Sequence, residues 1–269
     1  MKRRRSGEIL SPTARTARGV LAAILIVYTF TTVFVIGITL LDSLKTKGDL
    51  VSNFVGLPKA ISFDSYKKIL FEGDFINYFK NSIILTVGGT VGCTFLAALT
   101  AYGISRYDFK GKSFLTAYFL IGMMVPVQVS VLPLFLILKK IGLLNKLPGM
   151  ILVYMAGISM ACFVFQKFFR TIPVELEESA RLDGAGDFTI FFCIIIPVCK
   201  PVIATMALIT AIQEWNDFYM PMVLLGSKNV KSLTLAIYQY ISQFTRYMSE
   251  SMAAVIITLI PVIILYFLF

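Results

Sequence analysis

Six stretches of the chain are apolar over about the length of a helix that crosses a membrane. A helix rises about 1.5 Å per residue, so about 20 apolar residues span the hydrocarbon core of a bilayer. The stretches of this kind are 20–41, 82–104, 114–138, 149–169, 198–220 and 252–269. The sequence therefore predicts an all-α integral membrane protein with six transmembrane helices.

The composition supports this prediction and excludes other classes of protein. Hydrophobic residues make up 57% of the chain and charged residues 15%, with a mean hydropathy of +0.81, whereas soluble domains are less apolar and more charged. The chain has no histidine, so a hydrolytic or zinc enzyme is not expected. The four cysteines lie in or beside apolar runs without paired spacing, and we expect buried thiols rather than disulfides or metal ligands at Cys93, Cys162, Cys193 and Cys199.

The chain divides into a basic arm (1–19), a first transmembrane helix (20–41), an extracytoplasmic loop (42–80) and a core with five spans (81–269). The arm is expected to be structureless. Its basic cluster directly precedes the first span, which favours a cytoplasmic amino terminus and not a nucleic-acid-binding segment. Counted over the whole chain, with the arm included, Lys and Arg divide almost evenly between the two sides. The last span reaches Phe269 without a polar flank, so we expect the natural chain to continue.

Three smaller patterns lie within these regions. Residues 62–70 are amphipathic and predict a short interfacial helix. Gly88 and Gly92 are four residues apart, a spacing that lets a neighbouring membrane helix approach closely. The sequence Gly-Lys-Ser at 111–113 ends like a phosphate-binding loop, but that motif requires a glycine where Arg106 stands. We therefore expect this chain to bind no nucleotide, and no cofactor or metal of its own.

A polar segment, 171–197, interrupts the apolar second half of the chain. Pro173 suits the first turn of a helix, and the glutamates that follow complement the positive end of the helix dipole. Gly184 is expected to end this helix with backbone angles that disfavour a side chain. Asp187 is expected to cap a second helix. The segment thus predicts a helix–turn–helix of surface character between spans four and five.

The same segment resembles the cytoplasmic coupling loop of the membrane subunits of ABC importers. That loop has the signature Glu-Ala-Ala, three residues, Gly, nine residues, Ile, one residue, Leu-Pro. The matching positions are Glu178, Ala180, Gly184, Ile194 and Pro197, whereas Ser179 replaces an Ala and Ile196 replaces the Leu. Asp183-Gly184-Ala185 is the form usual among sugar permeases of this group.

The resemblance assigns coupling to an ATPase to eight residues: Glu175, Glu178, Ala180, Asp183, Gly184, Ala185, Ile194 and Pro197. Glu178 occupies the signature position, so we expect it to matter more for this contact than Glu177. The two helices are then expected to pass the closure of the ATPase to the spans as a rigid-body push, which produces alternating access.

The resemblance extends to most of the chain. The order of several motifs is similar to that of the maltose-type oligosaccharide permeases: Asn81-Ser82, Ala101-Tyr102-Gly103, 106–112, Val125-Pro126, 133–135, 142–145, 215–218 and 252–254. It implies the type I ABC importer fold in a bacterial or archaeal cytoplasmic membrane. The implied partners are membrane lipid, a homologous second permease subunit, two cytoplasmic ATPase subunits that hold ATP and Mg, and an extracytoplasmic sugar-binding protein.

Polar residues within two spans are candidates for a translocation pathway. Thr210, Gln213, Glu214 and Asp217 recur at helical spacing in span five. Span three is expected to be interrupted at Pro126 and Pro133, and Gln128 and Ser130 lie between these prolines. A carboxylate inside a membrane is costly and usually faces a cavity or a partner. Two interpretations stay open: Glu214 and Asp217 line the pathway, or they sit at the outer interface while the partner subunit alone holds the sugar.

A secondary transporter driven by an ion gradient is the alternative function. Such a carrier is expected to hold ionisable groups deep in several spans, or paired discontinuous segments in two repeated halves. Here deep charge is confined to one end of span five, and no second half repeats the first. The sequence therefore favours the ABC importer subunit, which has no catalytic residues of its own.

Overall fold

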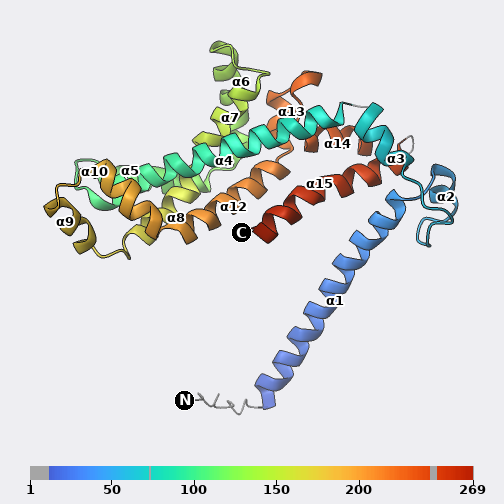
Figure 1. The fold of residues 1–269 in the computed structure, drawn as a ribbon, viewed down its shortest axis with the longest axis horizontal. Coiled ribbons are helices and arrows are strands. Elements are labelled where there is room, and N and C mark those ends of the chain that lie inside the picture. Colours follow the sequence, from blue (N-terminus) through green and yellow to red (C-terminus); the bar gives the residue numbers. More distant parts are fainter. Residues whose placement is uncertain (1–11, 73, 243–246, 269) are drawn as a thin grey trace.

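The computed structural model describes residues 12–72, 74–242 and 247–268, and all regular structure in them is helical (Figure 1). The longer helices are α1 (Pro12–Ser43), α4 (Phe75–Arg106), α5 (Lys112–Met124), α6 (Val131–Lys140), α7 (Leu147–Ala156), α8 (Ser159–Phe169), α9 (Glu175–Leu182), α12 (Lys200–Asn216), α14 (Leu233–Ser242) and α15 (Met248–Leu268). Between them lie α2 (Lys47–Ser52), α3 (Asp64–Lys67), η1 (Lys68–Glu72), η2 (Val127–Ser130), α10 (Asp187–Ile190), η3 (Phe191–Ile195), α11 (Ile196–Val198), α13 (Tyr219–Leu224) and η4 (Lys228–Val230).

The six predicted spans take two forms. α1, α4 and α15 each contain an unbroken apolar helix long enough to cross a membrane. Three further pairs meet that criterion only together: α5 with α6, bent by 100°, α7 with α8, bent by 41°, and 187–198 with α12, bent by 79°. With each bent pair counted as one span, the described residues hold six. The third pair reaches back to Asp187, which lies inside the polar segment 171–197.

The breaks occur where the backbone cannot continue a helix. α5 ends at Met124, and Val125 is extended because it precedes Pro126. Pro133 does not break α6, contrary to expectation, because it lies in the first turn, where its missing N–H has no partner to lose. Span five was predicted to run to 220, which was wrong, because α12 ends at Asn216 and Asp217 is extended.

Most of α1 stands apart from the other helices, and only its carboxyl-terminal part packs, against α15. It projects away from them in Figure 1, and none of its apolar window is buried within the chain. It begins at Pro12, a residue favoured at the first helical position. The prediction of a structureless arm was therefore wrong for residues 12–19, while residues 1–11 and Phe269 lie outside the described residues. A helix this apolar and uncovered is suited to a bilayer.

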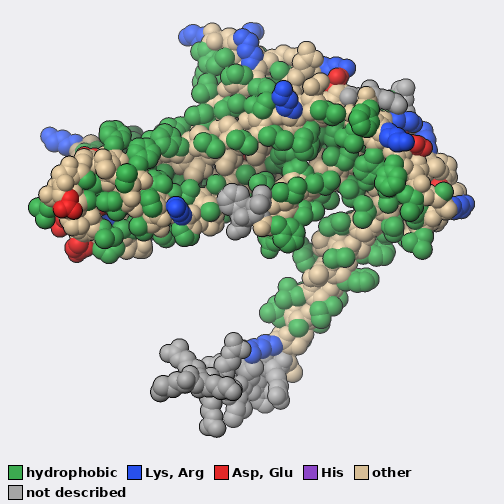
Figure 2. Space-filling model, viewed as in Figure 1, with side chains coloured by type: hydrophobic (Ala, Val, Ile, Leu, Met, Phe, Trp, Pro, Cys, Tyr) green, Lys and Arg blue, Asp and Glu red, His purple; other side chains and the backbone are tan. Residues whose placement is uncertain are grey.

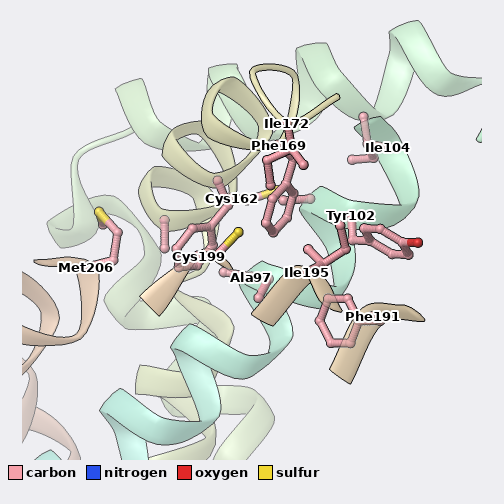
Figure 3. Close-up of a cluster of buried hydrophobic side chains, with 14 of the residues drawn as sticks. Ala97, Tyr102, Ile104, Cys162, Phe169, Ile172, Phe191, Ile195, Cys199 and Met206 are labelled. Carbon is pink, nitrogen blue, oxygen red and sulfur yellow. The ribbon is translucent and has the colours of Figure 1, made fainter. Parts of the chain in front are cut away.

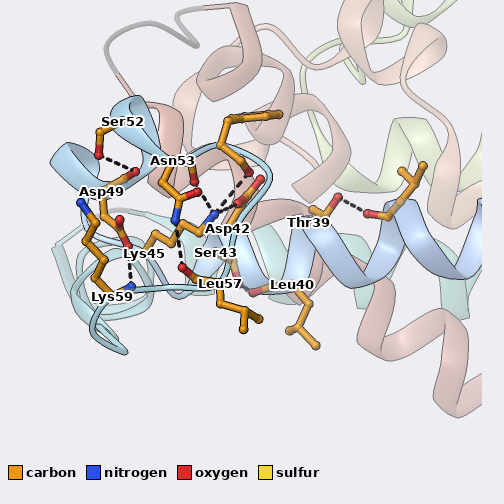
Figure 4. Close-up of polar contacts among 12 residues, drawn as sticks. Thr39, Leu40, Asp42, Ser43, Lys45, Asp49, Ser52, Asn53, Leu57 and Lys59 are labelled. Atoms are coloured by element: carbon orange, nitrogen blue, oxygen red, sulfur yellow. Dashed lines mark hydrogen bonds and ion pairs between the residues drawn. The ribbon is translucent and has the colours of Figure 1, made fainter.

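The segment after α1 is built around a buried lysine (Figure 4). Lys45 pairs with Asp42 at 2.7 Å and donates to the carbonyl oxygens of Asn53 (2.6 Å) and Phe54 (3.2 Å). The amide of Lys59 donates to the carboxylate of Asp49 at 2.9 Å. These contacts hold residues 42–59 in a fixed shape, and the predicted loop 42–80 ends earlier than expected because α4 begins at Phe75. The short helix predicted over 62–70 is found as α3 and η1.

The largest apolar core lies where α4, α8, η3 and the start of α12 meet (Figure 3). Tyr102, Phe169 and Phe191 pack there as an aromatic group with ring centroids 5.1–6.1 Å apart. On another face of α4, a side chain on Gly88 would lie 3.1 Å from Ile151, and one on Gly92 would collide with Met155. This confirms the predicted close helix contact. Cys193 is exposed, so the expectation of buried thiols was wrong for that residue, although the other three are buried.

Candidate functional site

Residues 171–198 form the predicted helix–turn–helix at one end of the bundle (Figure 1). Gly184 ends α9 with a φ of +86°. Its N–H donates to the carbonyl of Arg181 at 3.0 Å, and the N–H of Ala185 donates to that of Ala180 at 2.9 Å. These are the two hydrogen bonds of a Schellman motif. The prediction that Gly184 needs unusual backbone angles is confirmed.

The second helix begins differently from the prediction. Its N-cap is Gly186, and Asp187 makes no capping hydrogen bond at that end. The Asp187 carboxylate instead pairs with Arg181 at 2.7 Å, across the turn. The hydrogen bond that Arg181 donates to the Tyr107 hydroxyl oxygen, and then the charge of Asp187, raise the pKa of the Arg181 guanidinium. Arg181 therefore stays cationic and joins both helices of the loop to the end of α4.

One of the three glutamates of α9 faces inward. Glu177 is buried, with its Oε1 2.6 Å from Nε of Arg106 in an ionic contact. Its other oxygen accepts a hydrogen bond from the Tyr102 hydroxyl at 3.0 Å. Arg106 also donates from Nη2 to the carbonyl of Ile172 at 2.9 Å. Residues of α4, the segment before α9, and α9 itself are thus joined through one buried ion pair.

The opposite side of the helix–turn–helix carries uncovered apolar side chains. Leu182 is 90% exposed and Phe188 is 76% exposed, one on each side of the turn. Acidic side chains gather at this end of the molecule in Figure 2, and Glu175, Glu178 and Asp183 are exposed there. An apolar pair rimmed by charge on a polar segment has the composition of a protein-docking surface.

The eight residues assigned to coupling divide between this surface and the core. Glu175, Glu178, Asp183, Gly184 and Pro197 are exposed, whereas Ala180 is buried and Ala185 and Ile194 pack against the main apolar core. The exposed set can contact another protein directly. The inward set holds the loop against the bundle.

A cavity of about 340 Å³ lies deeper in the bundle. Its walls come from α4, α7, α8, α12 and the breaks near them: Cys93, Val127, Val153, Tyr154, Gly157, Met160, Ala161, Met206, Thr210, Gln213, Glu214, Asp217 and Met220. A mostly apolar cavity with a few convergent polar groups is the usual form of a small-molecule site. None of the described residues that line it is Lys or Arg.

The two carboxylates of the cavity are held by other helices. Glu214 accepts a hydrogen bond from the Thr90 hydroxyl at 3.1 Å, and Asp217 accepts one from the Tyr154 hydroxyl at 3.0 Å. Gly89 makes room for this arrangement, because a side chain there would collide with Glu214 and Tyr154. The other oxygen of Asp217 accepts from the amides of Tyr219 and Met220 and so starts α13.

The structure brings together only part of the predicted pathway set. Thr210, Gln213, Glu214 and Asp217 line the cavity, although Asp217 caps α12 and does not belong to it. Gln128 and Ser130 do not line it. They lie in η2, at the sharp bend, where the Ser130 hydroxyl donates to the carbonyl of Val127 at 2.7 Å. Only Val127 of this turn reaches the cavity, because a 3-10 turn points successive side chains in different directions.

Several residues of both sites were missed in the sequence. Nothing in the sequence marks Glu177 as their partner, but Arg106 and Tyr102 stand one helical turn apart at the end of an apolar span. That spacing was the available signal. Tyr154 is a lone hydroxyl in an apolar run, and Gly89 adjoins a recognised glycine pair. Among the described residues no cluster of three or more metal-ligating side chains occurs.

Comparisons with known proteins agree with this geometry. A family described as "Binding-protein-dependent transport system inner membrane component" matches residues 92–269. The arabinooligosaccharides transport system permease protein AraQ of Bacillus subtilis is 33% identical over 235 residues, which cover 86% of this chain and 83% of AraQ. The diacetylchitobiose uptake system permease protein NgcG of Streptomyces coelicolor is 32% identical over 233 residues, covering 86% and 77%.

A solved structure is also similar over nearly the whole chain. It is a bacterial ABC transporter involved in the import of the acidic polysaccharide alginate, with a TM-score of 0.83, 25% identity and 96% coverage of both chains. The all-α permease fold and the resemblance to ABC importer subunits are thereby confirmed. The chain belongs to the family of inner membrane components of binding-protein-dependent transport systems.

Proposed function

We propose that this chain is the permease subunit of an ATP-driven importer that moves a sugar, in particular an oligosaccharide, across the cytoplasmic membrane by alternating access. It pairs with a homologous permease subunit, two ATPase subunits that bind ATP and Mg, and an extracytoplasmic sugar-binding protein. The names of the AraQ and NgcG relatives support a sugar as substrate. This chain contributes no catalytic residue, and ATP hydrolysis belongs to its partners.

The observation that carries the proposal is the exposed apolar surface of the helix–turn–helix. Leu182 and Phe188 flank the turn of this segment at one end of the bundle, and the described part of this chain leaves both exposed. Burying such side chains against a partner stabilises the complex by about 1.5–3 kcal/mol each. Docking of an ATPase at this surface accounts for the exposure. It also puts the amino terminus in the cytoplasm, in agreement with the basic arm.

The position of the cavity supports a role in translocation. Its polar wall touches α4 at Gly89 and Thr90, near the middle of that 32-residue helix. A helix of this length crosses the hydrocarbon core with residues to spare at both ends. Glu214 therefore lies at membrane depth, which favours the pathway interpretation of this carboxylate over the interfacial one. Gln128 and Ser130 do not line the cavity, so the proposal gives them no contact with the sugar and places them only in the bend beside the cavity.

Co-purification tests the proposal most simply. We expect the tagged chain, extracted in mild detergent, to retain an ATPase and a second permease, and to hydrolyse ATP faster when the sugar-loaded binding protein is added. A chain that purifies alone and carries sugar in response to an ion gradient would support the secondary transporter instead.

Cysteine labelling tests the pathway. Cysteines placed singly at 209–218, in a background without the four native ones, should react with a polar thiol reagent at Thr210, Gln213, Glu214 and Asp217. Labelling should change when ATP traps the assembled complex, because alternating access changes the water in the cavity. Asn216, which is exposed but does not line the cavity, is the control. Reactivity that rises steadily toward Asp217 and ignores nucleotide would leave these residues at the outer interface.

A further inference from the structure

We infer that the buried ion pair of Arg106 and Glu177 fixes the coupling helix α9 rigidly to α4, and that α4 carries the motion of α9 to the cavity. The inference rests on the proposed function. It makes Arg106, Glu177 and Tyr102 positioning residues, because they act through α4 and touch neither sugar nor nucleotide.

The contacts of Glu177 fix it in place from two directions. Its side chain is 7% exposed and that of Arg106 is 9% exposed, with the charged atoms 2.6 Å apart. Tyr102, one turn earlier on α4, donates to the second carboxylate oxygen, and Arg106 also holds the carbonyl of Ile172 just before α9. A guanidinium that bonds both the helix and the segment leading into it limits the tilt and rotation of α9.

α9 has few other attachments to the bundle. Of its eight residues only Glu177 and Ala180 are buried. A helix of this length is not stable by itself in water, so its orientation depends on the contacts that it makes. Ala180 supplies only an apolar contact, which does not by itself fix the orientation of α9. The ion pair with its hydrogen bonds is therefore the directional anchor.

α4 reaches from this anchor to the cavity without a break. Thr90 on α4 donates to Glu214 in the cavity wall, and Cys93 lines the same cavity. Arg106 lies sixteen positions after Thr90, which is about 24 Å along a continuous helix. Three other spans are bent by 41–100°. A push on α9 therefore reaches Glu214 through one rigid element, the kind of connection that transmits coupling between distant sites.

A purely structural role for the pair is the competing explanation, and neutral variants separate the two. Glu177→Gln or Arg106→Gln alone leaves a buried charge without its partner, which is strongly unfavourable, so we expect less assembled complex. The double variant R106Q/E177Q leaves no buried charge, and we expect assembly to recover. The two amides lack the ionic contact, so α9 should remain loosely attached.

The readout is nucleotide-dependent labelling of Gln213→Cys by a charged methanethiosulfonate reagent, in the assembled complex without native cysteines. We expect ATP hydrolysis to continue in R106Q/E177Q while the ATP-induced change in labelling falls about fivefold or more. The matched control is Asp108→Asn, which breaks an exposed ion pair with Lys112 close to the same end of α4. It should leave the change in labelling intact.

Each outcome has one meaning. A double variant that recovers both assembly and the full change in labelling would overturn the inference, because the pair would then serve folding alone. A complex with Arg106 and Glu177 intact that shows no response to ATP would instead contradict the proposed function. Should the double variant fail to assemble, spin labels at the exposed positions Leu182 and Val91 in the purified chain decide the matter. A broader distance distribution than with the pair intact supports the inference, and an unchanged one overturns it.

Discussion

Replacing Gly184 with valine is expected to impair coupled transport strongly while the protein still inserts in the membrane. The residue has a φ of +86°, which L-residues with a branched Cβ rarely adopt. Holding it there costs about 1–3 kcal/mol, a shift of about five- to 150-fold against the native turn. The turn should open, which separates the two helices of the loop. ATPase retention and ATP-driven uptake should both fall by a factor in that range.

Gly186→Val is the matched control for this substitution. A side chain at either glycine would meet nothing within 4 Å, so the two sites are alike in available space. They differ in backbone conformation, because Gly186 is extended with a φ of −77°. Gly186→Val should therefore retain most transport. An equal loss of transport in both variants would contradict this account, because it would show that the loop does not tolerate a larger side chain at either position, whatever the backbone conformation.

Placing aspartates at both Leu182 and Phe188 is expected to detach the ATPase from an otherwise intact permease. Each apolar side chain contributes about 1.5–3 kcal/mol when buried, so their joint loss should weaken the complex by about 100-fold or more. Both residues are exposed in this chain, so folding should not suffer. The fraction of ATPase retained on the purified permease, measured against ATPase concentration, gives the affinity.

Leu57→Asp is the control, since Leu57 is 74% exposed on the loop at the far end of α1. It should retain the ATPase fully. Full retention in the Leu182 and Phe188 variant would mean that the ATPase docks elsewhere. In that case the exposure of these two residues would have no part in coupling.

The sequence predicts well those elements that depend on residues close together in the chain. The spans follow from apolar length, the turn at 184 from a glycine, and the break at 126 from a proline. The start of α13 was not predictable in this way. It depends on the Asp217 carboxylate accepting two backbone amides, while the Tyr154 hydroxyl, 63 residues away, donates to that carboxylate.

The directions of the three glutamate side chains on α9 could not be predicted from the sequence either, because they also depend on contacts with distant residues. The signature ranked Glu178 above Glu177 for contact with the ATPase, yet nothing in the sequence says which of the three glutamates points inward. Glu177 is selected by Arg106, 71 positions earlier, and only the path of α4 past α9 brings them together. Gln128 and Ser130 failed as cavity residues for a related reason. Their polarity suggested a pathway, but the bend between α5 and α6 directs them elsewhere.

ATP-driven uptake in a defined system tests the central claim most directly. The purified complex would be reconstituted in proteoliposomes with ATP inside and the binding protein, loaded with its own labelled sugar, outside. The account predicts uptake that requires internal ATP and the binding protein, and that continues when ionophores remove proton and sodium gradients. Uptake without ATP that ionophores abolish would contradict it.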